Sequence, residues 1–103
     1  MANQQTPVVD LLAEMTESSI EASHLPADTL MLVRIAALVA MDAPPASYML
    51  NLGAAGEMGV DADQIQGVLA AVAPIVGTAR IAAAAGHLLR AYGLSVGLSE
   101  AEA

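Results

Sequence analysis

Apolar residues recur with the period of an α-helix along most of the chain, and this pattern predicts five helical segments. The first begins at Thr6-Pro7, a capping residue followed by proline at the first helical position, and ends near residues 23–26. Its apolar positions are Val8, Leu11, Leu12 and Met15, and its acidic positions are Asp10, Glu14, Glu17 and Glu21. The two sets lie on opposite sides, so we expect a surface helix with one buried face.

The second and third segments are separated by a proline-containing break, Asp42-Ala43-Pro44-Pro45. The second is capped by Asp28 and runs to about Met41. It is apolar on all sides, which predicts burial from several directions. The third runs from about Pro45 to Met58 and contains Gly53 and Gly56. Glycine costs about 1 kcal/mol relative to alanine inside a helix, so we expect close backbone packing at both positions.

The strongest local signal lies between the third and fourth segments. Gly59 is expected to stop the third helix, and Asp61 with Gln64 forms a capping box for the fourth. Val60 and Ile65 stand at the positions of a hydrophobic staple. The fourth helix carries an apolar stripe and ends near Gly77; the stripe comprises Ile65, Val68, Leu69, Val72, Ile75 and Val76. The fifth helix starts at Thr78 and is expected to close at Gly93.

No alternating strand pattern competes with these helices, so the prediction is an all-α, compact bundle of about five helices. The 103 residues form one domain, 1–103, with flexible termini at about 1–5 and 95–103. Apolar residues make up 56% of the chain, and only two residues are aromatic. A chain of this size cannot cover so much apolar surface alone, so we expect an obligate oligomer of identical chains.

Charge and cysteine content exclude several classes of function. The chain has 11 acidic residues against three arginines and no lysine, a formal net charge of −8, which argues against nucleic-acid and anionic-membrane partners. It has no cysteine, so disulfides, thiolate nucleophiles and zinc–thiolate sites are excluded. The apolar run 67–86 is interrupted by Pro74, Gly77 and Arg80, so we interpret it as buried helix rather than a membrane span. We expect a cytoplasmic protein without a cofactor or metal.

Residues 28–92 resemble the carboxymuconolactone decarboxylase family, which includes the alkylhydroperoxidase D-like proteins. The resemblance rests on the very apolar second helix, the break at 42–45, a third helix ending in Gly59-Val60-Asp61, and an alanine-rich fifth helix. It implies a helical subunit of a homotrimer or homohexamer, with active sites between helices or subunits.

The resemblance also shows what this chain lacks. The thiol branch of the family has a Cys-x-x-Cys pair, a histidine and a glutamate, and these positions fall on Pro44, Ser47, Asn51 and near Leu32. Peroxide reduction through a thiolate is therefore excluded. The decarboxylase branch keeps the histidine, and Asn51 cannot exchange a proton near neutral pH.

Ser47, Tyr48 and Asn51 occupy what the resemblance implies to be the active-site cleft. Ser47 and Asn51 are four residues apart and share a helix face. They could orient a small polar ligand by hydrogen bonds. Alternatively, Ser47 belongs to the helix start and Asn51 bonds across a subunit interface.

Two basic residues are further candidates. Arg34, the only charge inside the second helix, needs a partner if buried. We favour an ion pair with Asp42, Glu57 or a carboxylate from another subunit over a clamp for a carboxylate ligand. His87 is the only plausible general base, but we favour a stripe of Arg80, His87 and Arg90 that pairs with the acidic face of the first helix or with the dipole near the end of the fifth helix.

Together these observations predict an oligomeric, carboxymuconolactone decarboxylase-like protein that binds a small carboxylate or lactone. A divergent, non-redox reaction of the decarboxylase or lyase type would use Arg34, Ser47, Tyr48 and Asn51 for binding and His87 with Asn51 for catalysis. The alternative is a non-catalytic assembly or partner-binding protein on the same fold. The first hypothesis predicts a solvent-connected pocket beside Ser47 and Asn51, and the second predicts tight packing there.

Overall fold

The computed structural model describes residues 6–102, with side-chain environments for residues 6–91. Every regular element in this range is a helix, which confirms the all-α prediction. The five helices are α1 (Pro7–Ser23), α2 (Ala27–Ala40), α3 (Pro45–Glu57), α4 (Ala62–Val76) and α5 (Thr78–Glu102). The segment 1–5, which the sequence predicts to be a flexible terminus, lies outside the described residues.

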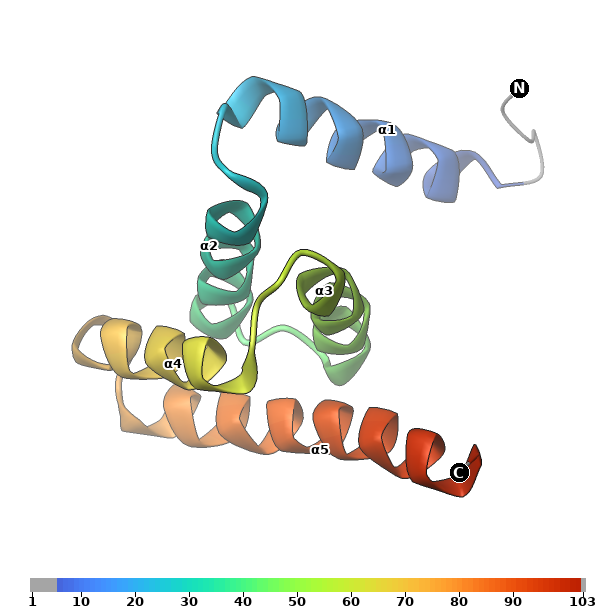
Figure 1. The fold of residues 1–103 in the computed structure, drawn as a ribbon. Coiled ribbons are helices and arrows are strands. Elements are labelled where there is room, and N and C mark those ends of the chain that lie inside the picture. The colour runs from blue at the N-terminus through green and yellow to red at the C-terminus, as the bar shows by residue number, and fades with distance from the viewer. Residues whose placement is uncertain (1–5, 103) are drawn as a thin grey trace.

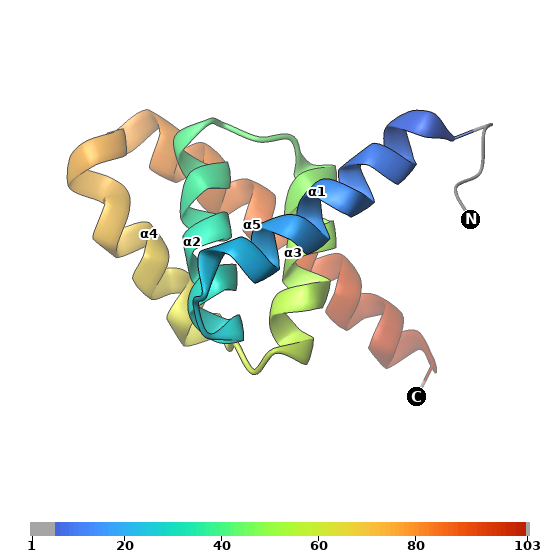
Figure 2. The ribbon, with the colours of Figure 1, turned by 90° about the horizontal axis from the view of Figure 1, so that it is seen from above.

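Helices α2 to α5 form the body of the molecule, and α1 lies across one side of it (Figures 1 and 2). Helix α2 packs against α3, α4 and α5, while α3 and α4 both pack on α5. Helix α1 makes no comparable contact with any other helix. In Figure 1 it lies at the opposite side of the body from α4 and α5.

The turn between α3 and α4 follows from its sequence. Gly59 adopts φ +86°, and the amide of Val60 donates to the carbonyl of Ala55 at 2.9 Å, which closes α3 with a Schellman motif. The Asp61 carboxylate then accepts from the Gln64 amide at 2.8 Å, and the Gln64 side chain accepts from the Asp61 amide at 3.0 Å. The predicted helix stop and capping box are therefore confirmed.

The same kind of turn ends α2, but without glycine. Asp42 adopts the left-handed conformation, and the amide of Ala43 donates to the carbonyl of Leu38 at 3.0 Å. The Arg80 guanidinium of α5 donates to the Ala40 carbonyl at this helix end. A cation at a helix C-terminus is favourable because of the helix dipole, so Arg80 joins α5 to the end of α2.

Two clusters of buried side chains form the core. One contains Val39, Ala43, Tyr48, Ala84, Leu88 and Ala91, and the other contains Met31, Ile35, Ala55, Val60 and Val68. Leu52 and Ile65 pack against both clusters. Ile65 with buried Val60 places the predicted staple in the second cluster, where the α3–α4 turn meets α2.

Several predictions about buried faces are wrong for the single chain. No residue of α1 is buried, although its pattern predicts a buried face. Helix α2 packs against α3, α4 and α5, which agrees with the predicted burial from several directions, but it is not covered on all sides, because Val33 is 53% exposed. On α4, Ile75 is 87% exposed rather than part of the core stripe. The hydrophobic pattern identifies the apolar face of each helix, but it does not indicate whether the same chain or another chain packs against that face.

Three local predictions also need correction. Asp28 lies inside the first turn of α2, where its carboxylate accepts from the Thr29 amide, and Pro26 takes the N-cap position. Helix α5 passes through Gly93 and continues to Glu102. No atom lies within 4 Å of a Cβ built on Gly53 or Gly56, so close backbone packing does not explain them within the chain.

The described helices are too short or too polar to span a membrane. None of them combines the length and the apolar content that crossing a bilayer requires. The apolar run at 67–86 is divided at Gly77, which has φ +93°, between α4 and α5.

Candidate functional site

Helix α3 carries the candidate site residues on two different faces. Ser47 and Asn51 share one face, and Tyr48 and Leu52 share the next, because residues four apart on a helix lie one above the other. Each face borders its own hollow in the surface. The candidate residues are therefore not gathered in one cleft.

The first hollow lies between α1, α2 and α3 and has a volume of about 360 Å³. We call it the polar hollow. It is lined by Leu12, Met15, Thr16, Ser19, Arg34, Ala37, Leu38 and Asn51. It brings together two of the predicted ligand-binding residues, Arg34 and Asn51, from different helices. Ser47, Tyr48 and His87 are not part of this lining.

Arg34 has few partners within the chain. Its Nη2 donates to the Thr16 carbonyl of α1 at 3.4 Å, which is long for such a bond. Among the residues that the structure describes, no carboxylate lies within 4.0 Å of the guanidinium, so the predicted ion pair with Asp42 or Glu57 is wrong for the single chain. The guanidinium is half-buried at the edge of the polar hollow and keeps most of its donors available.

Asn51 is held by its own helix. Its Nδ2 donates to the Ser47 carbonyl at 2.8 Å, one turn earlier. This bond fixes the orientation of the amide and leaves Oδ1 as an acceptor that no donor reaches within the described part of the chain. Ser47 thus positions Asn51 through its backbone rather than through its hydroxyl.

Tyr48 points away from the polar hollow into the core. It is 1% exposed, and its hydroxyl oxygen has no hydrogen-bond partner among the described residues. Its ring centroid lies 5.9 Å from that of His87 on α5. Burial raises the pKa of the Tyr48 hydroxyl above its ordinary value, and the negative charge of Asp42 raises it further.

His87 contacts this buried tyrosine instead of the acidic face of the first helix. Helices α1 and α5 form no extensive contact, so the predicted pairing of Arg80, His87 and Arg90 with that face does not occur within one chain. The Arg80 guanidinium instead donates to the Ala40 carbonyl at the end of α2.

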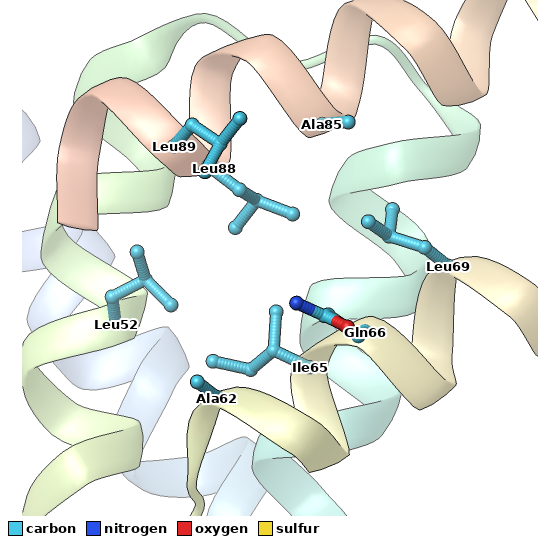
Figure 3. A pocket seen from close by; sticks show the side chains of 8 residues that line it. All are labelled: Leu52, Ala62, Ile65, Gln66, Leu69, Ala85, Leu88 and Leu89. Atoms are coloured by element: carbon cyan, nitrogen blue, oxygen red, sulfur yellow. The ribbon is translucent and has the colours of Figure 1, made fainter. Parts of the chain in front are cut away.

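The second hollow lies on the other side of α3, between α3, α4 and α5, and has a volume of about 510 Å³. We call it the leucine hollow. Figure 3 shows the side chains around it: Leu52, Ala62, Ile65, Gln66, Leu69, Ala85, Leu88 and Leu89. None of these eight residues is charged. The sequence pattern identified several of these positions as apolar, but it assigned them to a filled core and did not predict the hollow.

Metal binding has no visible basis in the described residues. They contain no group of three or more histidine, aspartate or glutamate side chains placed to hold an ion. The polar hollow itself is lined by one cation, three small polar side chains and four apolar ones, which suits an organic anion better than a metal ion.

Of three comparisons with known proteins, the one with family models gave a match. Neither the curated proteins nor the solved structures gave a match to the chain. The family model described as "Carboxymuconolactone decarboxylase family" matches residues 7–89, from the start of α1 into α5. This match covers most of the chain and confirms the resemblance, so the chain belongs to the carboxymuconolactone decarboxylase family.

Proposed function

We propose that this protein is an oligomeric member of its family that binds a small carboxylate or lactone in the polar hollow and has no thiol peroxidase activity. One observation carries the proposal: Arg34 and Asn51, from different helices, border the same hollow, and Arg34 has no described carboxylate partner. A positive group with available donors beside a solvent-connected hollow favours an anionic ligand.

The side chains that line the polar hollow favour a ligand with a carboxylate or lactone group at one end and a hydroxyl group at the other. The Arg34 guanidinium can donate two parallel hydrogen bonds to a carboxylate or bind a lactone carbonyl. The fixed Asn51 Oδ1 can accept from a ligand hydroxyl. Leu12, Met15 and Leu38 supply apolar walls for the carbon skeleton. A small hydroxylated carboxylate would use all three features.

The arrangement supports binding more strongly than turnover. A non-redox decarboxylase or lyase reaction needs a group that transfers a proton, and the residues lining the polar hollow include no histidine, aspartate or glutamate. The notable acid–base candidate, His87, contacts Tyr48 on the other side of α3. The chain has no cysteine for the thiol chemistry of the family.

One observation favours the alternative, a non-catalytic assembly protein on the same fold. The apolar stripe of α1 is uncovered in the single chain, which is typical of a surface that another chain covers. Self-assembly and ligand binding are compatible, and they can be tested separately.

The binding proposal is tested with a panel of small aliphatic and aromatic carboxylates and the corresponding lactones, by isothermal titration calorimetry. For a carboxylate that binds, we expect the Arg34→Gln variant to bind about tenfold to a hundredfold more weakly, because a hydrogen bond to a charged group contributes about 1.5–3 kcal/mol. Asn51→Ala should weaken a hydroxylated carboxylate more than its deoxy analogue.

Arg90→Gln is the matched control, since Arg90 is exposed on α5 and does not line the polar hollow. It removes the same charge from the chain and should leave affinity unchanged. Equal losses of affinity in the two arginine variants would mean that the effect comes from the net charge of the chain, which would contradict the proposed site. Failure of every carboxylate and lactone in the panel to bind would contradict the proposed function.

A further inference from the structure

Among the apolar surfaces that the described residues leave exposed, the first to consider is the stripe along α1. Val8, Leu11, Leu12 and Met15 are 54–66% exposed. Leu12 and Met15 border the polar hollow, yet more than half of each side chain remains accessible. The opposite side of the helix carries Glu14, Glu17 and Glu21, all exposed. Helix α1 is therefore amphipathic, with its apolar side largely uncovered.

The second uncovered surface is the leucine hollow. Leu88 forms part of the buried core, while the neighbouring Leu89 at the hollow is 73% exposed. Among the described residues of the lining, Gln66 alone has a polar side chain. In Figure 3 leucine side chains from three helices surround the open space, and the small Ala62 and Ala85 leave room beside them. Such a lining matches the apolar face of a helix.

The two surfaces cannot meet within one chain in this fold. Helix α1 and helix α5 lie on opposite sides of the body (Figure 1), and α1 makes no extensive contact with α4 or α5. The connection between α1 and α2 consists of residues 24–26 only, which is too short to carry α1 around the body. Any contact between them must therefore join two copies.

We propose that α1 of one copy docks its apolar stripe in the leucine hollow of a second copy. The stripe has the i, i+3, i+4, i+7 spacing with which amphipathic helices anchor in apolar grooves. Neither the stripe nor the described lining of the hollow contains a charge, so docking desolvates no ion among these residues. The glutamates of α1 stay in solvent, and exposed Arg90, next to Leu89 on α5, offers them a counter-charge.

The inference rests on the oligomeric part of the proposed function, and it shares Leu12 and Met15 with the proposed ligand site. It specifies which surfaces of the chain touch in the assembly. It also accounts for the exposed apolar face of α1, which the pattern predicts to be buried.

The cysteine-free chain allows a direct test by site-specific cross-linking. One chain carries Leu11→Cys, a second chain with a different tag carries Leu89→Cys, and the two are co-expressed and treated with a short bis-maleimide. We expect a covalent dimer that contains both tags, because the two thiols would lie within one interface. The matched control replaces the second chain with one carrying Ile75→Cys, an exposed apolar position of α4 outside the hollow, and should give far less mixed dimer.

A mixed dimer that forms equally with both partners, or with neither, would overturn the proposed contact. Native mass spectrometry of the unmodified protein separates the causes. An oligomer without the specific cross-link overturns this contact only, whereas a single species of 10.4 kDa overturns the contact and the oligomeric part of the proposed function together.

A second variant tests the energetics without introducing thiols. Leu11→Glu should weaken self-association by about tenfold or more, since burying a leucine contributes about 1.5–3 kcal/mol. Because α1 has no buried residue, the helical circular dichroism of the chain should be retained. Loss of the fold, or unchanged self-association, would contradict the proposal, and so would a small apolar molecule found bound in the leucine hollow of the purified protein.

Discussion

Asn51 and Leu52 are neighbours in α3, yet they border different hollows. Asn51 faces the polar hollow with Arg34, where its amide is tied to the backbone one turn earlier. Leu52 faces the leucine hollow and packs against both clusters of the core. The two positions are separated by about 100° around the helix axis, which is enough to give them different surroundings.

The comparison shows that the proposed ligand-binding residue of α3 and the residue that packs on the core lie on different faces of one helix. On the face with Ser47 and Asn51, both residues are half-buried, and the Asn51 amide donates to the Ser47 carbonyl of the same helix. The face with Tyr48 and Leu52 contacts α5 and the core. We therefore expect that residue types at the polar face can change with little effect on folding.

Substituting the two neighbours should give the largest difference in stability. Leu52→Ala removes contacts with both clusters and is expected to lower the free energy of unfolding by about 2 kcal/mol or more. Asn51→Ala loses one hydrogen bond within its helix but gains helix propensity, so its effect should stay within about 0.5 kcal/mol. Urea unfolding of both variants and the parent measures the difference. Similar costs for the two substitutions would mean that the faces are not energetically distinct.

Local signals predicted the turn between α3 and α4 well. The stop at Gly59 and the capping box of Asp61 and Gln64 depend only on residues within a few positions, so they can be recognised without tertiary structure. Asp28 was misassigned because Ala27 already lies in helix after Pro26, which takes the cap position. The end of α5 was misassigned because Gly93 was interpreted as a helix stop, whereas the helix continues through it.

The candidate site was predictable only in part. The resemblance placed Asn51 at a functional position, and the isolated charge of Arg34 identified it as exceptional in α2. Their common hollow depends on how α1 crosses α2 and α3, which no spacing along the chain encodes. Likewise, the burial of Tyr48 and the uncovered face of α1 depend on packing between distant segments.

Tyr48→Phe is expected to have a smaller and opposite effect on stability. The buried hydroxyl has no described hydrogen-bond partner, so removing it should raise the free energy of unfolding by about 1 kcal/mol. Because the pKa of Tyr48 is raised in the folded state, folded chains hold this proton more tightly than unfolded ones. Stability should therefore fall as the pH rises from about 10, the ordinary tyrosine pKa, through the folded-state pKa.

Unfolding in urea between pH 8 and pH 11 checks both parts of this expectation. The phenylalanine variant should be more stable than the parent at pH 8, and its stability should fall less steeply above pH 10. A parallel decline in the two proteins would assign the alkaline sensitivity to other groups. A less stable variant would mean that the hydroxyl has a partner.

We expect the smallest effect on stability from a substitution at Gly53, which lies on a third face of α3. This residue follows Leu52, is exposed, and has no atom within 4 Å of a built Cβ, so it borders open space in the single chain. Gly53→Ala should raise the free energy of unfolding by about 0.5–1 kcal/mol, because alanine is the better helix former. The result also reports on assembly, since a second chain packed closely at this face would clash with the added methyl group. Stabilisation with unchanged native mass would leave this part of α3 outside the interface, as docking at the leucine hollow requires. Dissociation of the oligomer would instead move the interface to the glycine face and contradict the proposed contact between copies.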